Sequence, residues 1–285
     1  MFSARIIINT ALLVLVLTAA ALAQRVAVLS PDGTDGSSSY AAKLESSMSG
    51  QVKLVDDSLA KSAFDASAFI SPYNLSLEEA KRVGRAIGCD FFLLVRSAVQ
   101  RRSSFERDEY YDAYAFVFLV SSRSGRLIAR PYTTQISGKA DDARRDLDST
   151  ISATANLLIE KLRSAVKSEL NEAPPPAMEE PPDERSLAAK NFRAPVPFRR
   201  LKPEYTRLAD EYEVTATVDM LVDVDADGHV QRTEITRWAG YDLDESVDKD
   251  VRSMNWRPAE RDGKFLPMRF LVRYNFKKID KVPKP

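Results

Sequence analysis

The sequence is interrupted by a segment that has little capacity to form a core, NEAPPPAMEEPPDERSLAAK at residues 171–190. It contains five prolines and an excess of acidic residues, and it has almost no large apolar side chain. Proline fixes the backbone angle φ and lacks an N–H donor, so this composition predicts a stiff, solvated linker. A chain of 285 residues has room for about two domains with cores of their own. We therefore expect one domain at 24–170 and a second at 191–285.

Residues 1–23 have the features of an export signal. Arg5 precedes an apolar run, and Ala21-Leu22-Ala23 fits the small-residue cleavage pattern. A strand-like segment starts directly at Arg25, which favours cleavage after Ala23 and a periplasmic location. The apolar run from Ile6 is also long enough to span a bilayer. An uncleaved inner-membrane anchor, with the rest of the chain facing the periplasm, is therefore the alternative.

Residues 24–170 alternate β-type runs with helical patterns, which predicts an α/β domain with a mixed sheet and helices packed on it. Ser76 and Glu79 have the spacing of a capping box and predict a helix start. Ser-Arg-Ser-Gly125 predicts a hairpin turn. The expected strands are 26–29, 52–55, 91–95, 110–121 and 127–135; the expected helices are 38–48, 76–88 and a long one through Leu147, Ile151, Leu158 and Leu162.

About residues 24–168 resemble the amino-terminal domain of TolB and the related CsgG-like domains. The resemblance rests on RVAVLS at Arg25, LSLEEAKRVGRAIGCDFFLLV at Leu75 and SGRLIAR at Ser124. It implies a periplasmic interaction domain and not a catalytic one.

The segment DVDADGHVQRTE, from Asp223 to Glu234, has the spacing of an EF-hand calcium loop. An EF-hand loop follows a helix, whereas apolar side chains alternate with period two through 214–224, which predicts a strand. Asp-Gly at 227–228 is typical of a β-hairpin tip. We therefore interpret the segment as a hairpin without a specific metal. Calcium-dependent binding is the alternative, and its ligands would be Asp223, Asp225, Asp227 and Glu234.

The sequence patterns in the rest of the second domain predict one helix and a last strand. Asp242 and Glu245 fit an N-cap and a capping box, and Leu243, Val247 and Val251 share one helical face. Strict alternation then continues from Met268 to Phe276. The order strand, strand, helix, strand predicts a small α+β domain, in which a three-stranded antiparallel sheet packs on the helix.

The block at about 195–278 resembles the carboxy-terminal domain of the TonB family. The matching features are KPEYTRLA at Lys202, the DVDADGHV hairpin, AGYDLDESV, NWRPA followed by DGK, and RYNF in the last strand. The block differs from the family near its start, where this chain has Tyr205-Thr206 and the family has a tyrosine–proline pair.

This resemblance implies that an extended segment of an outer-membrane or other envelope protein adds to a sheet edge by β-augmentation. On its outer face Arg269, Arg273 and Asn275 either select a polar or acidic partner or only solvate the surface. The implied binding edge is the last strand, Met268, Arg269, Phe270, Leu271, Val272, Arg273, Tyr274, Asn275 and Phe276.

Composition and motifs favour a binding protein over an enzyme. Basic and acidic residues balance at 41 each, so charge recruits neither nucleic acid nor a membrane surface. Cys89 and His229 are the single residues of their kinds, and no nucleotide or hydrolase fingerprint is present, so we expect no cofactor. We expect a non-enzymatic envelope protein that acts as a soluble periplasmic adaptor or scaffold. A membrane-anchored energy transducer for outer-membrane transport is the alternative.

Overall fold

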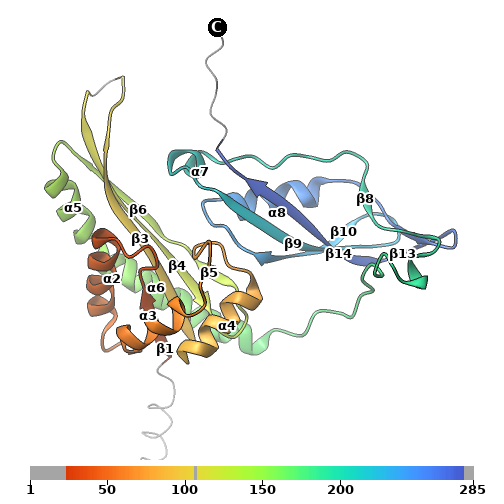
Figure 1. Cartoon of the computed structure of the whole chain (residues 1–285), viewed down its shortest axis with the longest axis horizontal. Helices are drawn as coiled ribbons and strands as arrows, with labels where there is room; N and C mark the ends of the chain where they lie inside the picture. The colour runs from red at the N-terminus through yellow and green to blue at the C-terminus, as the bar shows by residue number, and fades with distance from the viewer. Residues whose placement is uncertain (1–23, 106–107, 279–285) are drawn as a thin grey trace, which may run out of the picture. The chain divides into compact units, whose positions relative to one another are not determined.

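The computed structural model describes residues 24–105 and 108–278 (Figure 1). The expected export signal at 1–23 lies outside these residues. Within them, no helix is both long and apolar enough to cross a membrane. The described chain forms two compact units, the first from 24–68, 83–105, 108–123 and 128–166, and the second from 69–82, 124–127 and 167–278.

The first unit is built on a mixed sheet of order β2-β1-β3-β4-β5, in which β6 also pairs with β4. β1 is parallel to β2 and β3, whereas β3, β4 and β6 run antiparallel. The predicted α/β class is confirmed. The elements up to the linker, of which α4, β5 and α6 belong in part to the second unit, are β1 (Arg25–Leu29), α2 (Asp35–Met48), β2 (Lys53–Leu54), α3 (Asp57–Asp65), α4 (Leu77–Ile87), β3 (Phe91–Arg102), β4 (Tyr110–Ser121), β5 (Leu127–Ala129), β6 (Tyr132–Ser137), α5 (Ala140–Ser149) and α6 (Ile151–Asn171).

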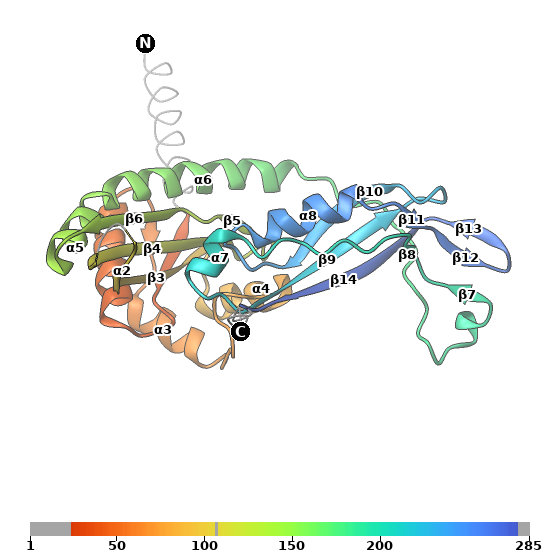
Figure 2. The ribbon, with the colours of Figure 1, turned by 90° about the horizontal axis from the view of Figure 1, so that it is seen from above.

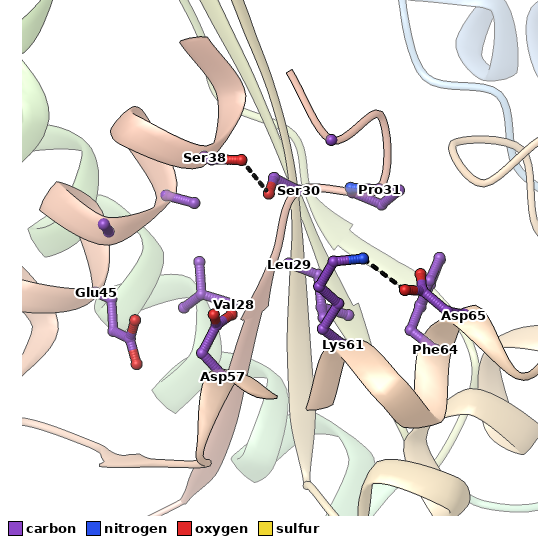
Figure 3. A pocket seen from close by; sticks show the side chains of 13 residues that line it. Val28, Leu29, Ser30, Pro31, Ser38, Glu45, Asp57, Lys61, Phe64 and Asp65 are labelled. Carbon is purple, nitrogen blue, oxygen red and sulfur yellow. Dashed lines mark hydrogen bonds and ion pairs between the residues drawn. The ribbon is translucent and has the colours of Figure 1, made fainter. Parts of the chain in front are cut away.

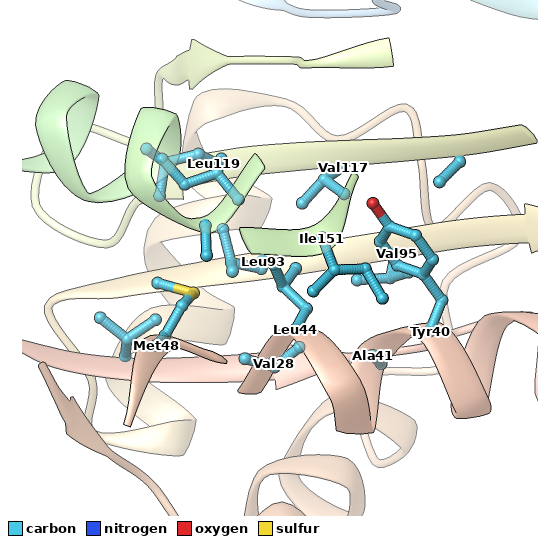
Figure 4. Close-up of a cluster of buried hydrophobic side chains, with 14 of the residues drawn as sticks. Val28, Tyr40, Ala41, Leu44, Met48, Leu93, Val95, Val117, Leu119 and Ile151 are labelled. Carbon is cyan, nitrogen blue, oxygen red and sulfur yellow. The ribbon is translucent and has the colours of Figure 1, made fainter. Parts of the chain in front are cut away.

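One face of this sheet forms the main core of the first unit. Because strand side chains alternate, Leu93 and Val95 of β3 point to the same face as Val117 of β4. They meet Leu44 of α2 and Ile151 of α6, all buried in one cluster (Figure 4). Figure 2 shows α6 along this face and α3 on the opposite side of the sheet.

Three elements of the first unit differ from the prediction. The strand expected at 127–135 is divided into β5 and β6, because Pro131 lacks an N–H donor; its carbonyl accepts from the Val117 N–H at 3.1 Å. The expected long helix ends and restarts at Thr150, whose hydroxyl bonds the Leu147 carbonyl at 2.7 Å. β3 continues to Arg102, beyond its expected end at Val95, because it pairs with β4 along its whole length.

The second unit contains the predicted antiparallel sheet, in the order β10-β9-β14, and helix α8 packs on it. Short strands that were not predicted form two smaller sheets, β11-β8 and β13-β12-β7. The bounds are η1 (Leu187–Ala189), β7 (Phe192–Arg193), β8 (Val196–Pro197), α7 (Arg207–Glu211), β9 (Ala216–Val224), β10 (Val230–Arg237), α8 (Leu243–Ser253), β11 (Trp256–Arg257), β12 (Ala259–Arg261), β13 (Lys264–Leu266) and β14 (Met268–Phe276).

The two predicted helix caps have different outcomes. The capping box is confirmed: the Ser76 N–H donates to Glu79 Oε2 at 2.7 Å, and the Glu79 N–H donates to Ser76 Oγ at 3.2 Å. The cap predicted at Asp242 is wrong, because Asp242 has a left-handed φ of 62° and its side chain makes no capping bond. Asp244 instead accepts the N–H groups of Ala239 and Gly240, each at 2.8 Å.

Candidate functional site

The last strand, β14, lies at one end of the β10-β9-β14 sheet. The Arg269 N–H donates to the Glu179 carbonyl at 2.8 Å, so it points away from β9. Because backbone groups alternate in an antiparallel strand, Leu271, Arg273 and Asn275 also direct their N–H and C=O groups outward. Within 24–105 and 108–278, no backbone hydrogen bond joins these three residues to another strand on that side. The strand therefore has an open edge.

The side chains of β14 divide between the core and the surface. Met268, Phe270 and Phe276 are buried, and Phe270 packs edge-on against Trp256 with ring centroids 4.9 Å apart. On the other face, Leu271 is 52% exposed. The open edge thus carries an exposed apolar side chain between charged neighbours.

Both arginines of β14 are paired with aspartates of β9. Arg269 Nε and Nη2 bond the two carboxylate oxygens of Asp223 at 2.6 and 2.7 Å, and Arg273 bonds Asp219 at 2.6 and 2.8 Å. These hydrogen bonds raise the pKa of both arginines, because they favour the charged guanidinium. Both aspartates are buried. The two arginine charges therefore face partners within the sheet, and their selection of a polar or acidic segment stays a prediction.

The segment 223–234 forms the predicted hairpin between β9 and β10. Of the four possible calcium ligands, Asp223 pairs with Arg269, and Glu234 pairs with Arg126 and Arg232 at 3.0 and 2.7 Å. Asp225 accepts the N–H groups of Asp227 and His229, each at 2.9 Å.

The hydrogen bond from the His229 backbone is the main reason why the pKa of Asp225 is lowered. Asp225, Asp227 and His229 bring ligand atoms within 4.8 Å of one another. The structure thus brings together two of the four possible ligands, and the calcium alternative stays a prediction.

β10 pairs with β9 only from Asp219 onward, on the side of β9 opposite β14. The segment 69–82 contacts β9 on this side beyond the end of β10. The Asn74 side chain accepts the Thr217 N–H at 2.9 Å and donates to the carbonyls of Thr217 and Trp238 at 2.8 and 2.7 Å. Ser76 forms an antiparallel bridge with Arg237, and Arg237 donates to the Asn74 carbonyl at 2.7 Å. The Asn74 amide thus takes the place that a neighbouring strand would take. No local signal in the sequence indicates this contact.

We expect Asn74→Ala to lower the free energy of unfolding of the second unit by about 2 kcal/mol, because the buried carbonyl of Trp238 and the part-buried backbone groups of Thr217 would lose their partner. Urea unfolding followed by tryptophan fluorescence measures the change, since Trp238 lies at the contact. Asn275→Ala removes one hydrogen bond from an exposed side chain and should cost less than about 1 kcal/mol. Equal effects of the two substitutions would contradict this role of Asn74.

The first unit has a pocket of about 190 Å³ at the carboxyl end of β1 (Figure 3). Glu45 and Asp57 contribute carboxylates, and Lys61 pairs with Asp65 at 2.5 Å. Partial burial raises the pKa of Glu45, and the charge of Asp57 adds to this effect. The three other charged side chains are exposed, so we assign no ligand to this pocket.

Residues 202–277 match the family model described as Gram-negative bacterial TonB protein C-terminal. The match spans less than half of the chain and includes the hairpin, α8 and β14. It supports an envelope-associated role in protein binding. No curated protein matches the chain. The resemblance of 24–168 to TolB and CsgG-like domains stays a prediction.

Several solved structures are similar to parts of the chain. The TonB carboxy-terminal domain of Pseudomonas aeruginosa is 20% identical over 34% of this chain and 94% of that chain, with a TM-score of 0.27. Lipoprotein GNA1162 of Neisseria meningitidis is 14% identical over 48% and 99%, with a TM-score of 0.32. The LpoB carboxy-terminal domain of Salmonella enterica is 15% identical over 39% and 81%, with a TM-score of 0.26. These TM-scores lie below 0.5, so only the family match supports the role.

Proposed function

We propose that this chain, whose residues 202–277 match the TonB C-terminal family, is a non-enzymatic cell-envelope protein that captures an extended segment of a partner protein. The partner segment adds to β14 as a further strand. The observation that carries the proposal is the outward N–H of Arg269, because it sets the direction of the open backbone groups along the strand. The protein acts as a periplasmic adaptor or scaffold.

Affinity comes from the backbone and selectivity from the side chains beside it. A partner strand next to β14 would bond the outward groups of Leu271, Arg273 and Asn275 in turn. Leu271 would contact an apolar side chain of the partner, since it is more than half exposed. The opposite end of the sheet is less suited, because Asn74 and Ser76 already bond β9 and β10 there.

A photo-crosslinking amino acid in place of Leu271 should trap the partner in the native cell, and a peptide with the trapped sequence provides the ligand. This peptide should slow amide exchange at Leu271, Arg273 and Asn275 by about tenfold or more. The amides of Val272 and Tyr274 should change little, because they bond β9 already. Hydrogen exchange resolved by NMR measures all five amides.

Leu271→Pro removes an outward N–H and leaves the ladder to β9 intact, because residue 271 faces away from β9. It should weaken peptide binding about tenfold, whereas Leu271→Ala keeps the N–H and should cost less. Unchanged exchange at Val272 shows that the proline variant is folded. Peptide protection confined to the first unit, or equal affinity of the two variants, would rule out augmentation on β14.

A further inference from the structure

The open edge of β14 begins beside a contact with the linker. The Glu179 carbonyl accepts the Arg269 N–H at 2.8 Å, and the Glu179 carboxylate forms an ion pair with Arg261 of β12. Met178 is half-buried, whereas the linker residues 171–177 before it are exposed. The linker therefore lies against the sheet at this point, although its composition predicts full solvation.

Arg261 is positioned to receive a carboxylate. Its guanidinium lies over the Phe192 ring, with Cζ 5.6 Å from the ring centroid. Its Nε is buried and has no hydrogen-bond partner among the described residues. Buried donors are normally paired, and this one remains able to donate to a further acceptor. Nη2 already bonds Glu179, and an incoming carboxylate could engage Nη2 and Nε together.

The other arginine at this corner contributes its backbone and not its charge. Arg269 directs its guanidinium to the buried Asp223 carboxylate, and its side chain is only 13% exposed. Its N–H points outward, to the Glu179 carbonyl. Arg261 thus offers a cationic group, and Arg269 offers a backbone N–H donor. An extended peptide complements both, because a backbone carbonyl can accept from the N–H and an acidic side chain can pair with the guanidinium.

We propose that Arg261 and the Arg269 N–H form a binding site for an acidic residue of an extended peptide, and that Glu179 occupies this site in the free protein. The inference rests on the proposed function and deepens it: the partner segment carries an acidic residue that displaces Glu179. The partner segment then continues along Leu271, Arg273 and Asn275. Its acidic residue fixes the register, because it can meet Arg261 at one position only.

The proposal that Glu179 occupies this site can be tested in the free protein, without a partner peptide. Glu179→Gln should speed amide exchange at Arg269 by about tenfold, because it removes the charge-assisted bond that holds the linker in place. Glu184→Gln is the matched control: it removes the same charge from the same linker and should leave Arg269 unchanged. Equal exchange at Arg269 in all three proteins would overturn the proposal.

The chemistry of the ligand is tested with a synthetic peptide of residues 174–184, PPPAMEEPPDE, added to the full chain carrying Glu179→Gln. The peptide should shift the NMR signals of the Arg269 amide and the Arg261 Nε–H. A peptide with glutamine in place of Glu179 and Glu180 should shift them at least fivefold less at the same concentration. Arg261→Gln should abolish the shift of the Arg269 amide, whereas Arg199→Gln should retain it.

Shifts of equal size with the glutamine peptide, or shifts at other residues only, would overturn the acidic specificity. The result of this peptide titration is independent of the test for strand addition to β14. That test reads the amides of Leu271, Arg273 and Asn275 with a partner peptide, whereas this one reads Arg261 and Arg269.

Discussion

Asp223→Ala should lower the free energy of unfolding of the second unit by about 3–5 kcal/mol, because it leaves the Arg269 guanidinium largely buried without its partner. Asp223 is 3% exposed, and both of its carboxylate oxygens bond Arg269. Denaturant unfolding measures the change. Asp227→Ala, in the exposed tip of the same hairpin, should alter stability by less than about 0.5 kcal/mol.

A double-mutant cycle with Arg269→Leu separates the ion pair from other effects of Asp223. If the pair carries the effect, the double variant Asp223→Ala, Arg269→Leu regains much of the stability lost in Asp223→Ala. The same variants test the calcium alternative. If calcium stabilises the wild-type chain but not Asp223→Ala, Asp223 has a metal role. If Asp223→Ala loses the same free energy of unfolding with and without calcium, Asp223 acts only in the ion pair.

Gly228→Ala is expected to cost about 3 kcal/mol, from backbone strain together with a steric clash. Gly228 has a φ of +90°, and an added Cβ would lie 2.0 Å from the Trp256 carbonyl oxygen. The Trp256 N–H also donates to the Gly228 carbonyl at 3.3 Å, so the hairpin tip cannot move away without losing that bond. Thermal unfolding followed by tryptophan fluorescence measures the loss, since Trp256 is at the contact.

Gly263→Ala provides the control for backbone strain alone. Its φ is +77°, and an added Cβ would meet no atom within 4 Å. Its cost should be about 1 kcal/mol, which is the usual cost of a left-handed backbone for a residue with a Cβ. If the two variants lose equal stability, close packing at Trp256 is not what requires glycine at 228.

The elements that the sequence predicts best are those with a strong local pattern. Apolar alternation at 214–224 and 268–276 identified β9 and β14, because one buried face forces period two in the sequence. Strands of two or three residues, such as β8 and β12, are too short to establish a period. The cap at Asp242 failed because this residue has a left-handed backbone, whereas an N-cap residue has an extended one.

The position of β14 at one end of its sheet was predictable, but the contacts of its side chains were not, and its role in binding stays a prediction. The TonB resemblance indicated β14 as the edge, and the strand order agrees. The pairs Arg269–Asp223 and Arg273–Asp219 depend on the register of two strands that no short turn connects, so the pattern of either strand alone does not determine them. The linker contact at Glu179 involves one backbone hydrogen bond and one ion pair, which composition cannot indicate.

The bond between Asn74 and Thr217 also bears on the order in which the protein assembles. The two residues are separated by 143 positions, so the sheet of the second unit is completed by a segment from the first third of the chain. Contacts between distant residues require a large loss of chain entropy before they stabilise the fold, and they slow folding. The contacts of this early segment with β9 and β10 can therefore form only after both strands are in place. The second unit consequently cannot complete its sheet from the residues after the linker alone.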